Sequence, residues 1–238
     1  NINNIKINPY LDLNGRGVLV GLIDTGIDYL NEEFIREDDT SRIVSIWDQT
    51  IKNSNDRRVY MGKIYSNEEI NNAINARRNN GDPYAIVPSR DENGHGTKVA
   101  GIIGARGYNK EFQGVAPECS FVIVKLFEST NFRRQLQENG VPEIPVYNAS
   151  EIVGGLEYLR KLSRERRQPM VIYIGVGSTE GSHDGTNLIS RYVTSLGNER
   201  GICTVAGVGN EGDSQGHASG YIKNQGDIKV VDLRIPKE

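Results

Sequence analysis

Three polar residues stand where the chain changes from one structural pattern to another. Asp24 ends the apolar run 18–24, His95 lies between two glycines at the start of a helical pattern, and Asn210 lies in the glycine-rich turn 206–212. A carboxylate can orient an imidazole, an imidazole can take up and return a proton, and an amide can stabilise a developing oxyanion. Each residue alone also has a structural explanation: a cap or turn for Asp24 and His95, and a left-handed turn for Asn210.

The glycines on both sides of His95 suggest that another molecule comes close to its imidazole. A histidine in a hydrophobic core does not need such clearance, whereas one that exchanges a proton with a bound molecule does. A zinc site is not expected, because the segment 94–97 has no second His or Cys at a ligand spacing, and His183 and His217 are not expected to pair on a metal. No clustered acidic loop indicates calcium, and we expect no cofactor.

Composition excludes several classes of protein. The chain has 238 residues, 37% of them hydrophobic, which is enough for one large domain with its own core. The net charge of −3 gives no basic field for nucleic acid, and no apolar run has the ~20 residues of a membrane span. Two cysteines exclude a disulfide framework, and Cys203, inside an apolar run, is expected to be buried. Because the chain starts at Asn1 without a signal-peptide pattern, we expect a processed product.

Four nearly continuous apolar runs predict strands that are buried on both faces, as in a parallel sheet: 18–24, 121–127, 170–176 and 202–208. Apolar residues at helical spacing follow His95 and recur from Ile152 to Leu162 and from Leu188 to Leu196. This alternation predicts an open α/β fold, a parallel sheet with helices on both faces.

Residues 37–94 interrupt the alternation. They are polar, rich in Asn, Asp and Arg, and contain no apolar run like those of the four strands. Ser66 and Glu69 form a capping-box pattern that predicts one short helix. We therefore expect a surface excursion rather than a second domain.

The motifs around the three polar residues, taken together, resemble the subtilisin-like serine proteases. Asp-Thr-Gly follows a strand, His-Gly-Thr opens a helix, and Gly-Asn-Glu-Gly follows a later strand, in the order of that family. The resemblance implies a subtilisin-like sheet, with Asp24 as the acid of a catalytic triad, His95 as the general base and Asn210 as the oxyanion donor.

The same resemblance implies part of the substrate cleft. Gly175, Val176 and Gly177 stand where the family has a Ser-Leu-Gly-like stretch along the cleft, with Gly175 in place of the serine. Glu211 follows the oxyanion asparagine and is expected near the substrate pocket, where it would favour a basic residue.

Several phrases of the sequence are similar to the Csp germination proteases of spore-forming clostridia and their relatives. These phrases are RIVSIWDQTI (42–51), DPYAIVPSRDENGHGT (82–97) and GSHDGTNLISRY (181–192). The similarity implies a protease of the spore that activates the proenzyme of a cortex-lytic hydrolase by limited proteolysis. Its partners would then be that protein substrate and its own propeptide.

The nucleophile is missing from the expected place. The family carries its serine in a Gly-Thr-Ser-x-Ala-like turn, but beyond Asn210 the chain has only Ser214 and Ser219, and neither lies in such a turn. We expect residues 1–220 to be the N-terminal part of a catalytic domain, with the serine outside this chain. The segment 221–238 is expected to start an inserted β-rich jelly roll, with a strand within 224–235.

Two alternatives to a protease remain open. A pseudoprotease would use the same fold as a binding or signalling scaffold, and the residue at the nucleophile position would distinguish it from the enzyme. A generic nucleotide-binding α/β domain is less consistent with the sequence, because no GxGxxG or P-loop glycine pattern follows the first apolar run.

Overall fold

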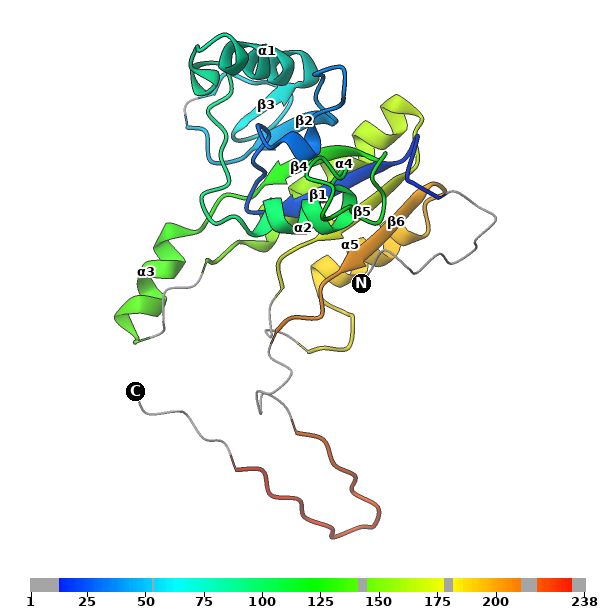
Figure 1. Ribbon diagram of the computed structural model, residues 1–238. Helices are drawn as coiled ribbons and strands as arrows, with labels where there is room; N and C mark the ends of the chain where they lie inside the picture. The colour runs from blue at the N-terminus through cyan, green and yellow to red at the C-terminus, as the bar shows by residue number, and fades with distance from the viewer. Residues whose placement is uncertain (1–12, 53, 141–144, 178–181, 211–217, 233–238) are drawn as a thin grey trace.

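The protein is built on one six-stranded sheet. A computed structural model describes residues 13–52, 54–140, 145–177, 182–210 and 218–232. The strands lie in the order β3-β2-β4-β1-β5-β6 (Figure 1). Their bounds are β1 (Leu19–Asp24), β2 (Ile43–Asp48), β3 (Lys63–Ser66), β4 (Ser120–Lys125), β5 (Met170–Ile174) and β6 (Ile202–Ala206). All neighbours pair in parallel except β2 and β3, which are antiparallel.

Helices cover both faces of the sheet, as the sequence predicts. The five α-helices are α1 (Asn67–Arg78), α2 (His95–Gly104), α3 (Thr130–Glu138), α4 (Ala149–Arg166) and α5 (Leu188–Gly197), with short 3₁₀ turns at Glu32–Phe34 and Pro83–Ala85. Side chains of α1 and α2 pack into one buried cluster, and those of α4 and α5 into another. α3 projects away from the body in Figure 1 and buries none of its residues. No helix in the described ranges is long and apolar enough to cross a membrane.

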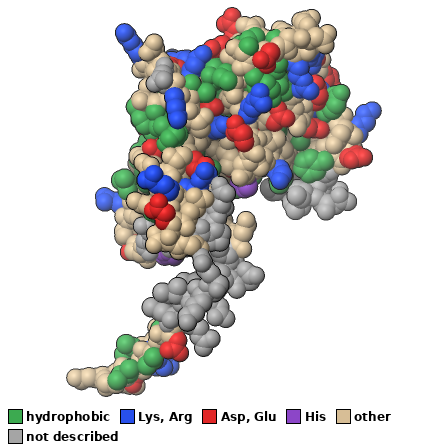
Figure 2. All heavy atoms as spheres, turned by 90° about the vertical axis from the view of Figure 1, so that its left-hand side faces the viewer, with side chains coloured by type: hydrophobic (Ala, Val, Ile, Leu, Met, Phe, Trp, Pro, Cys, Tyr) green, Lys and Arg blue, Asp and Glu red, His purple; other side chains and the backbone are tan. Residues whose placement is uncertain are grey.

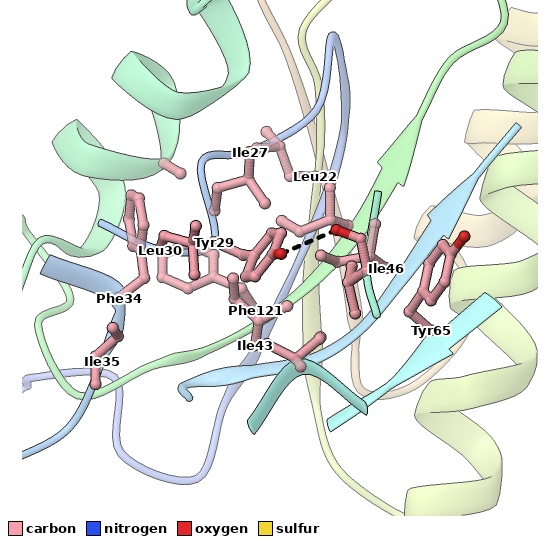
Figure 3. Packing of buried hydrophobic residues seen from close by; sticks show 14 of the residues in the cluster. Leu22, Ile27, Tyr29, Leu30, Phe34, Ile35, Ile43, Ile46, Tyr65 and Phe121 are labelled. Carbon is pink, nitrogen blue, oxygen red and sulfur yellow. Dashed lines mark hydrogen bonds between the residues drawn. The ribbon is translucent and has the colours of Figure 1, made fainter. Parts of the chain in front are cut away.

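The central strand β1 divides its side chains between the two clusters. Val20 and Leu22 belong to the α1–α2 side, whereas Leu19 and Ile23 belong to the α4–α5 side. This alternation is the consequence of a strand that is buried on both faces. On the α1–α2 side, Tyr29 lies inside the cluster, and its hydroxyl donates to the carbonyl of Val87 at 2.9 Å (Figure 3).

The expectation that residues 37–94 form a surface excursion with one short helix is wrong for β2 and β3. β2 is almost wholly buried and pairs with β4, and β3 forms the edge of the sheet beyond it. Polar residues in and beside β2 interrupt its apolar pattern, and two of them have partners inside the protein: the buried Arg42, just before β2, donates to the carbonyl of Cys119, and Ser45 hydrogen-bonds Tyr158. The capping box that Ser66 and Glu69 predict is present at the start of α1.

Two further expectations, for Cys203 and for the C-terminal segment, differ from the structure. Cys203 is exposed rather than buried, because β6 is the edge strand and only part of its surface is covered. Residues 228–232 form no strand, and Ile228 and Val230 are exposed. Residues 233–235 of the predicted jelly-roll strand lie outside the described residues. Cys119, by contrast, is buried, and burial raises the pKa of its thiol to about 11.

Candidate active site

Asp24 lies at the carboxyl end of the central strand and is fully buried. Its Oδ1 accepts hydrogen bonds from the backbone N–H of Thr25 and from Nδ1 of His95, each at 2.7 Å. Burial raises the pKa of the Asp24 carboxyl above its ordinary value, although the hydrogen bonds from His95 and Thr25 act in the opposite direction. The predicted contact between Asp24 and His95, 71 residues apart in the chain, is therefore present.

His95 is the first residue of α2, and its side chain is 47% exposed. Because a carboxylate can only accept, the neutral ring carries its proton on Nδ1 and directs it to Asp24. Its other nitrogen, Nε2, is left unprotonated and able to accept a proton from a bound molecule. A buried carboxylate, an oriented imidazole and an accessible face are what a general base requires.

The two glycines beside His95 serve different purposes. Gly94 has a left-handed backbone (φ 79°), which favours glycine, and a Cβ there would meet nothing within 4 Å. Gly96 is buried, and a Cβ there would lie 2.2 Å from the carbonyl oxygen of Gly26 and 3.2 Å from Asp24. The second glycine thus lets α2 approach the turn after β1, and the expectation that it clears space for a ligand is wrong.

Gly175 lies against the acid of the pair. A Cβ on Gly175 would come 1.7 Å from Oδ2 of Asp24, a buried oxygen with no hydrogen-bond partner among the described residues. The backbone N–H of Gly175 donates to the carbonyl of Ile23 at 2.9 Å, which extends the pairing of β5 with β1 by one residue. Gly175 therefore determines the space around Asp24, a role that its predicted place in the substrate cleft did not suggest.

The other predicted site residues follow strands that end at the same edge. Val176 is partly buried against the α4–α5 cluster, and Gly177 is exposed. Asn210 is exposed and lies just beyond β6, two strands from β1 on the side of β5. Because β1, β5 and β6 are parallel, their carboxyl ends lie at the same end of the sheet. Asn210 comes after the carboxyl end of β6, at the end of the sheet where Asp24 lies. Glu211 lies outside the described residues.

A buried lysine supports the loop before His95. Lys125 ends β4, in register with Asp24, and its ammonium group donates to the carbonyl of Arg90 at 2.6 Å and to the carboxylate of Glu92 at 2.8 Å. Lys125 is not among the residues that the sequence motifs indicate. The available signal was a charged residue at the end of an otherwise apolar strand.

No grouping of three or more His, Cys, Asp or Glu side chains in the described parts of the chain is suited to hold a metal ion. On the face shown in Figure 2, acidic and basic side chains are interspersed, and a histidine side chain reaches the surface.

A mostly parallel sheet with helices on both faces, whose central strand ends in an aspartate hydrogen-bonded to a histidine at the start of a helix, defines a class of subtilisin-like proteins. The chain belongs to the subtilase family, whose family model matches residues 15–230.

Among solved structures, the chain is similar to the CspB protease of Clostridium perfringens, with 33% identity over 87% of this chain and 39% of that chain, at a TM-score of 0.70. Among curated relatives, it is 30% identical to subtilisin E of Bacillus subtilis over 56% of this chain and 28% of the relative. It is 26% identical to the PI-type proteinase of Lactococcus lactis subsp. cremoris over 88% of this chain and 10% of the relative. The chain thus spans less than half the length of each of these proteins.

Proposed function

We propose that this chain is the acid- and base-bearing part of a serine endopeptidase. The observation that carries the proposal is the 2.7 Å contact between the buried carboxylate of Asp24 and Nδ1 of the half-exposed His95. That contact lies at the carboxyl end of the sheet, where open α/β folds place their functional groups. Membership of the subtilase family supports the same assignment.

In the proposed reaction, a serine hydroxyl attacks the carbonyl carbon of a peptide bond while Nε2 of His95 takes the hydroxyl proton. Asp24 keeps the ring in the required tautomer and stabilises the imidazolium that forms. The side-chain amide of Asn210 would donate to the oxyanion. His95 then returns the proton to the leaving amine, the acyl-enzyme remains, and water activated by His95 hydrolyses it.

We propose that the serine is carried by a segment outside residues 1–238 that packs on the open part of the α2 face. A groove of about 870 Å³ runs along this face beside β1, β5 and β6. Most of its side chains are apolar, among them Val20, Ile102, Ile103, Val115, Val171 and Val205. Apolar side chains gathered in one groove favour a covering element over permanent contact with water.

We further propose that the protein acts in the spore as a germination protease. Its protein substrate would be the proenzyme of a cortex-lytic hydrolase, cleaved at a limited number of sites, and its own propeptide would be a second partner. The phrases 42–51, 82–97 and 181–192, together with the similarity to the CspB protease, support this substrate class.

The alternative is a pseudoprotease that keeps the fold and binds a partner without cutting it. The presence of both Asp24 and His95, in contact, favours the enzyme. The test is to treat the full-length protein with a fluorophosphonate probe and, separately, with the proenzyme. Covalent labelling and cleavage are expected. Binding of the proenzyme without labelling or cleavage would identify the scaffold instead.

A further inference from the structure

Asp91, four residues before His95, has a carboxylate that accepts four hydrogen bonds near the site. Its Oδ1 accepts from the hydroxyl of Thr25 at 2.7 Å and from the N–H of Gly94 at 2.9 Å. Its Oδ2 accepts from the N–H of Thr97 at 2.8 Å and from the hydroxyl of Thr97 at 2.6 Å. Burial alone would raise the pKa of the Asp91 carboxyl, but these hydrogen bonds lower it below its ordinary value.

The donors come from both elements that carry the Asp24–His95 pair. Thr25 directly follows Asp24, and its hydroxyl oxygen also accepts the N–H of Gly96 at 3.0 Å, the residue after His95. The hydroxyl oxygen of Thr97 accepts the N–H of Asp28 at 2.9 Å, from the loop after β1. Asp91 thus joins the end of β1 to the first turn of α2 on both sides of the catalytic contact.

α2 needs such a group because its own cap position cannot supply one. Gly94 is the N-cap, and a glycine has no side chain to accept the first free N–H groups of the helix. The carboxylate of Asp91 accepts the N–H of Thr97, the third residue of α2, and places a negative charge at the positive end of the helix dipole. The loop that carries Asp91 is in turn held by Lys125, which bonds the residues on either side of it.

We propose that Asp91 is a positioning residue that sets the imidazole of His95 against the carboxylate of Asp24. Its hydrogen bonds reach neither of these two side chains directly, and it acts through Thr25 and the first turn of α2. A displacement of a catalytic group by about 1 Å can cost 10²-fold in rate, so the registry of these two elements matters for turnover. The effect on turnover rests on the proposed function, whereas the geometry of the His95–Asp24 pair does not.

The experiment compares Asp91→Asn with Asp56→Asn in the full-length protein. Asp56 is a matched control, because its carboxylate also accepts several hydrogen bonds, from Arg58 and from the N–H of Ile64, but it lies in the segment between β2 and β3. Both variants are expected to lower the melting temperature. Only Asp91→Asn is expected to shift or broaden the low-field proton resonance of His95 Nδ1 and to lower kcat by about 10²-fold, with KM changed by less than about twofold.

A second pair of variants keeps the proposal testable if Asp91→Asn does not fold. Thr97→Val removes the hydroxyl bond to Asp91 and is expected to move the resonance, whereas Thr97→Ser keeps the hydroxyl and is expected to restore it. An unchanged resonance in Thr97→Val, or in a folded Asp91→Asn, would overturn the proposal and leave Asp91 a purely structural cap. If the wild-type protein shows no turnover, the proposed function fails, and the resonance still decides the role of Asp91.

Discussion

The two oxygens of the Asp24 carboxylate have different surroundings, and this difference explains why a glycine is needed at position 175. Oδ1 accepts from Thr25 and His95, whereas Oδ2 faces the backbone of Gly175. Asp24 and His95 can be identified from the sequence. Asp24 ends an apolar run, and His95 lies between two glycines at the start of a helical pattern. The contact of Gly175 with Asp24 has no local signature in the sequence, because the residue after β5 and the last residue of β1 meet only in the folded sheet.

Gly175→Ala is expected to displace the carboxylate of Asp24, since the added Cβ would lie 1.7 Å from Oδ2. Loss of the acid from a catalytic triad costs roughly 10⁴-fold, so we expect displacement to lower kcat by about 10²- to 10⁴-fold. Peptide turnover and circular dichroism would measure activity and fold together. Gly197→Ala in α5, where a Cβ meets nothing within 4 Å, is the control. Full activity in a folded Gly175→Ala protein would contradict this account of the site.

His95→Ala in the full-length protein is expected to remove nearly all turnover, because no other group accepts the proton of the nucleophile in the proposed reaction. Asn210→Ala is expected to lower kcat by about 10²- to 10³-fold, the usual cost of one oxyanion donor. Cleavage of the proenzyme, followed by gel electrophoresis and initial rates, provides the measurement. Undiminished cleavage by His95→Ala would reject its assignment as the general base.

At the scale of elements, the α/β order was predictable, and β2 was not. The four predicted strands are continuous apolar runs, but β2 contains Ser45 and ends at the buried Asp48. Ile43, Ile46 and Trp47 are typical of a buried strand, but the polar residues around them made the segment look like part of a surface loop. Ser45 is tolerated inside because it hydrogen-bonds Tyr158, which lies far along the chain, and such a partner is not visible in a local pattern.

An ion pair within α4, between Arg160 and Glu157, also contacts Tyr192 of α5 and has a predictable pH dependence. The guanidinium of Arg160 lowers the pKa of Glu157 to about 2, aided by the hydroxyl of Tyr192 on α5. A carboxylate whose pKa is lowered on folding stabilises the native state above its unfolded pKa, and this contribution is lost as the pH falls towards 2.

Glu157→Gln is therefore expected to lower the free energy of unfolding by about 1 kcal/mol at neutral pH, a figure that allows for solvent screening. The difference from wild type should shrink between about pH 4.5 and 2. Urea titrations across this range would measure it. Glu165→Gln, on the exposed side of α4, is the control, and a pH-independent difference for Glu157→Gln would show that the charge contributes nothing.

At the scale of the whole molecule, the two faces of the sheet are unequally covered. α4 and α5 bury their side, but beside α2 the edge strand β6 is left partly exposed, with Val205 at 44% and Ile102 of α2 at 52%. Composition and hydrophobic periodicity do not reveal this asymmetry. They describe each helix or strand separately and do not show which other elements pack on it. The wrong expectation for Cys203 has the same cause.

Residues 1–238 produced alone are expected to associate or to unfold without a sharp transition, and to lack peptidase activity, because the apolar groove beside α2 would face water. Light scattering, binding of a hydrophobic dye and thermal melting would test this, with the full-length chain measured in parallel. A monomer that melts cooperatively and hydrolyses peptide bonds would mean that the nucleophile has been assigned to the wrong segment.

The order of the strands also has a consequence for the time at which the site forms. β1 is made early, but its two neighbours in the sheet are β4, which begins at Ser120, and β5, which begins at Met170. Contacts between distant parts of a chain form slowly, because the loop between them must first be closed. During synthesis on the ribosome, Asp24 is therefore expected to become buried beside His95 only after β4 and β5 have been made and have paired with β1. The topology therefore makes the Asp24–His95 contact a late event in folding, formed after strands that are distant in the sequence have paired.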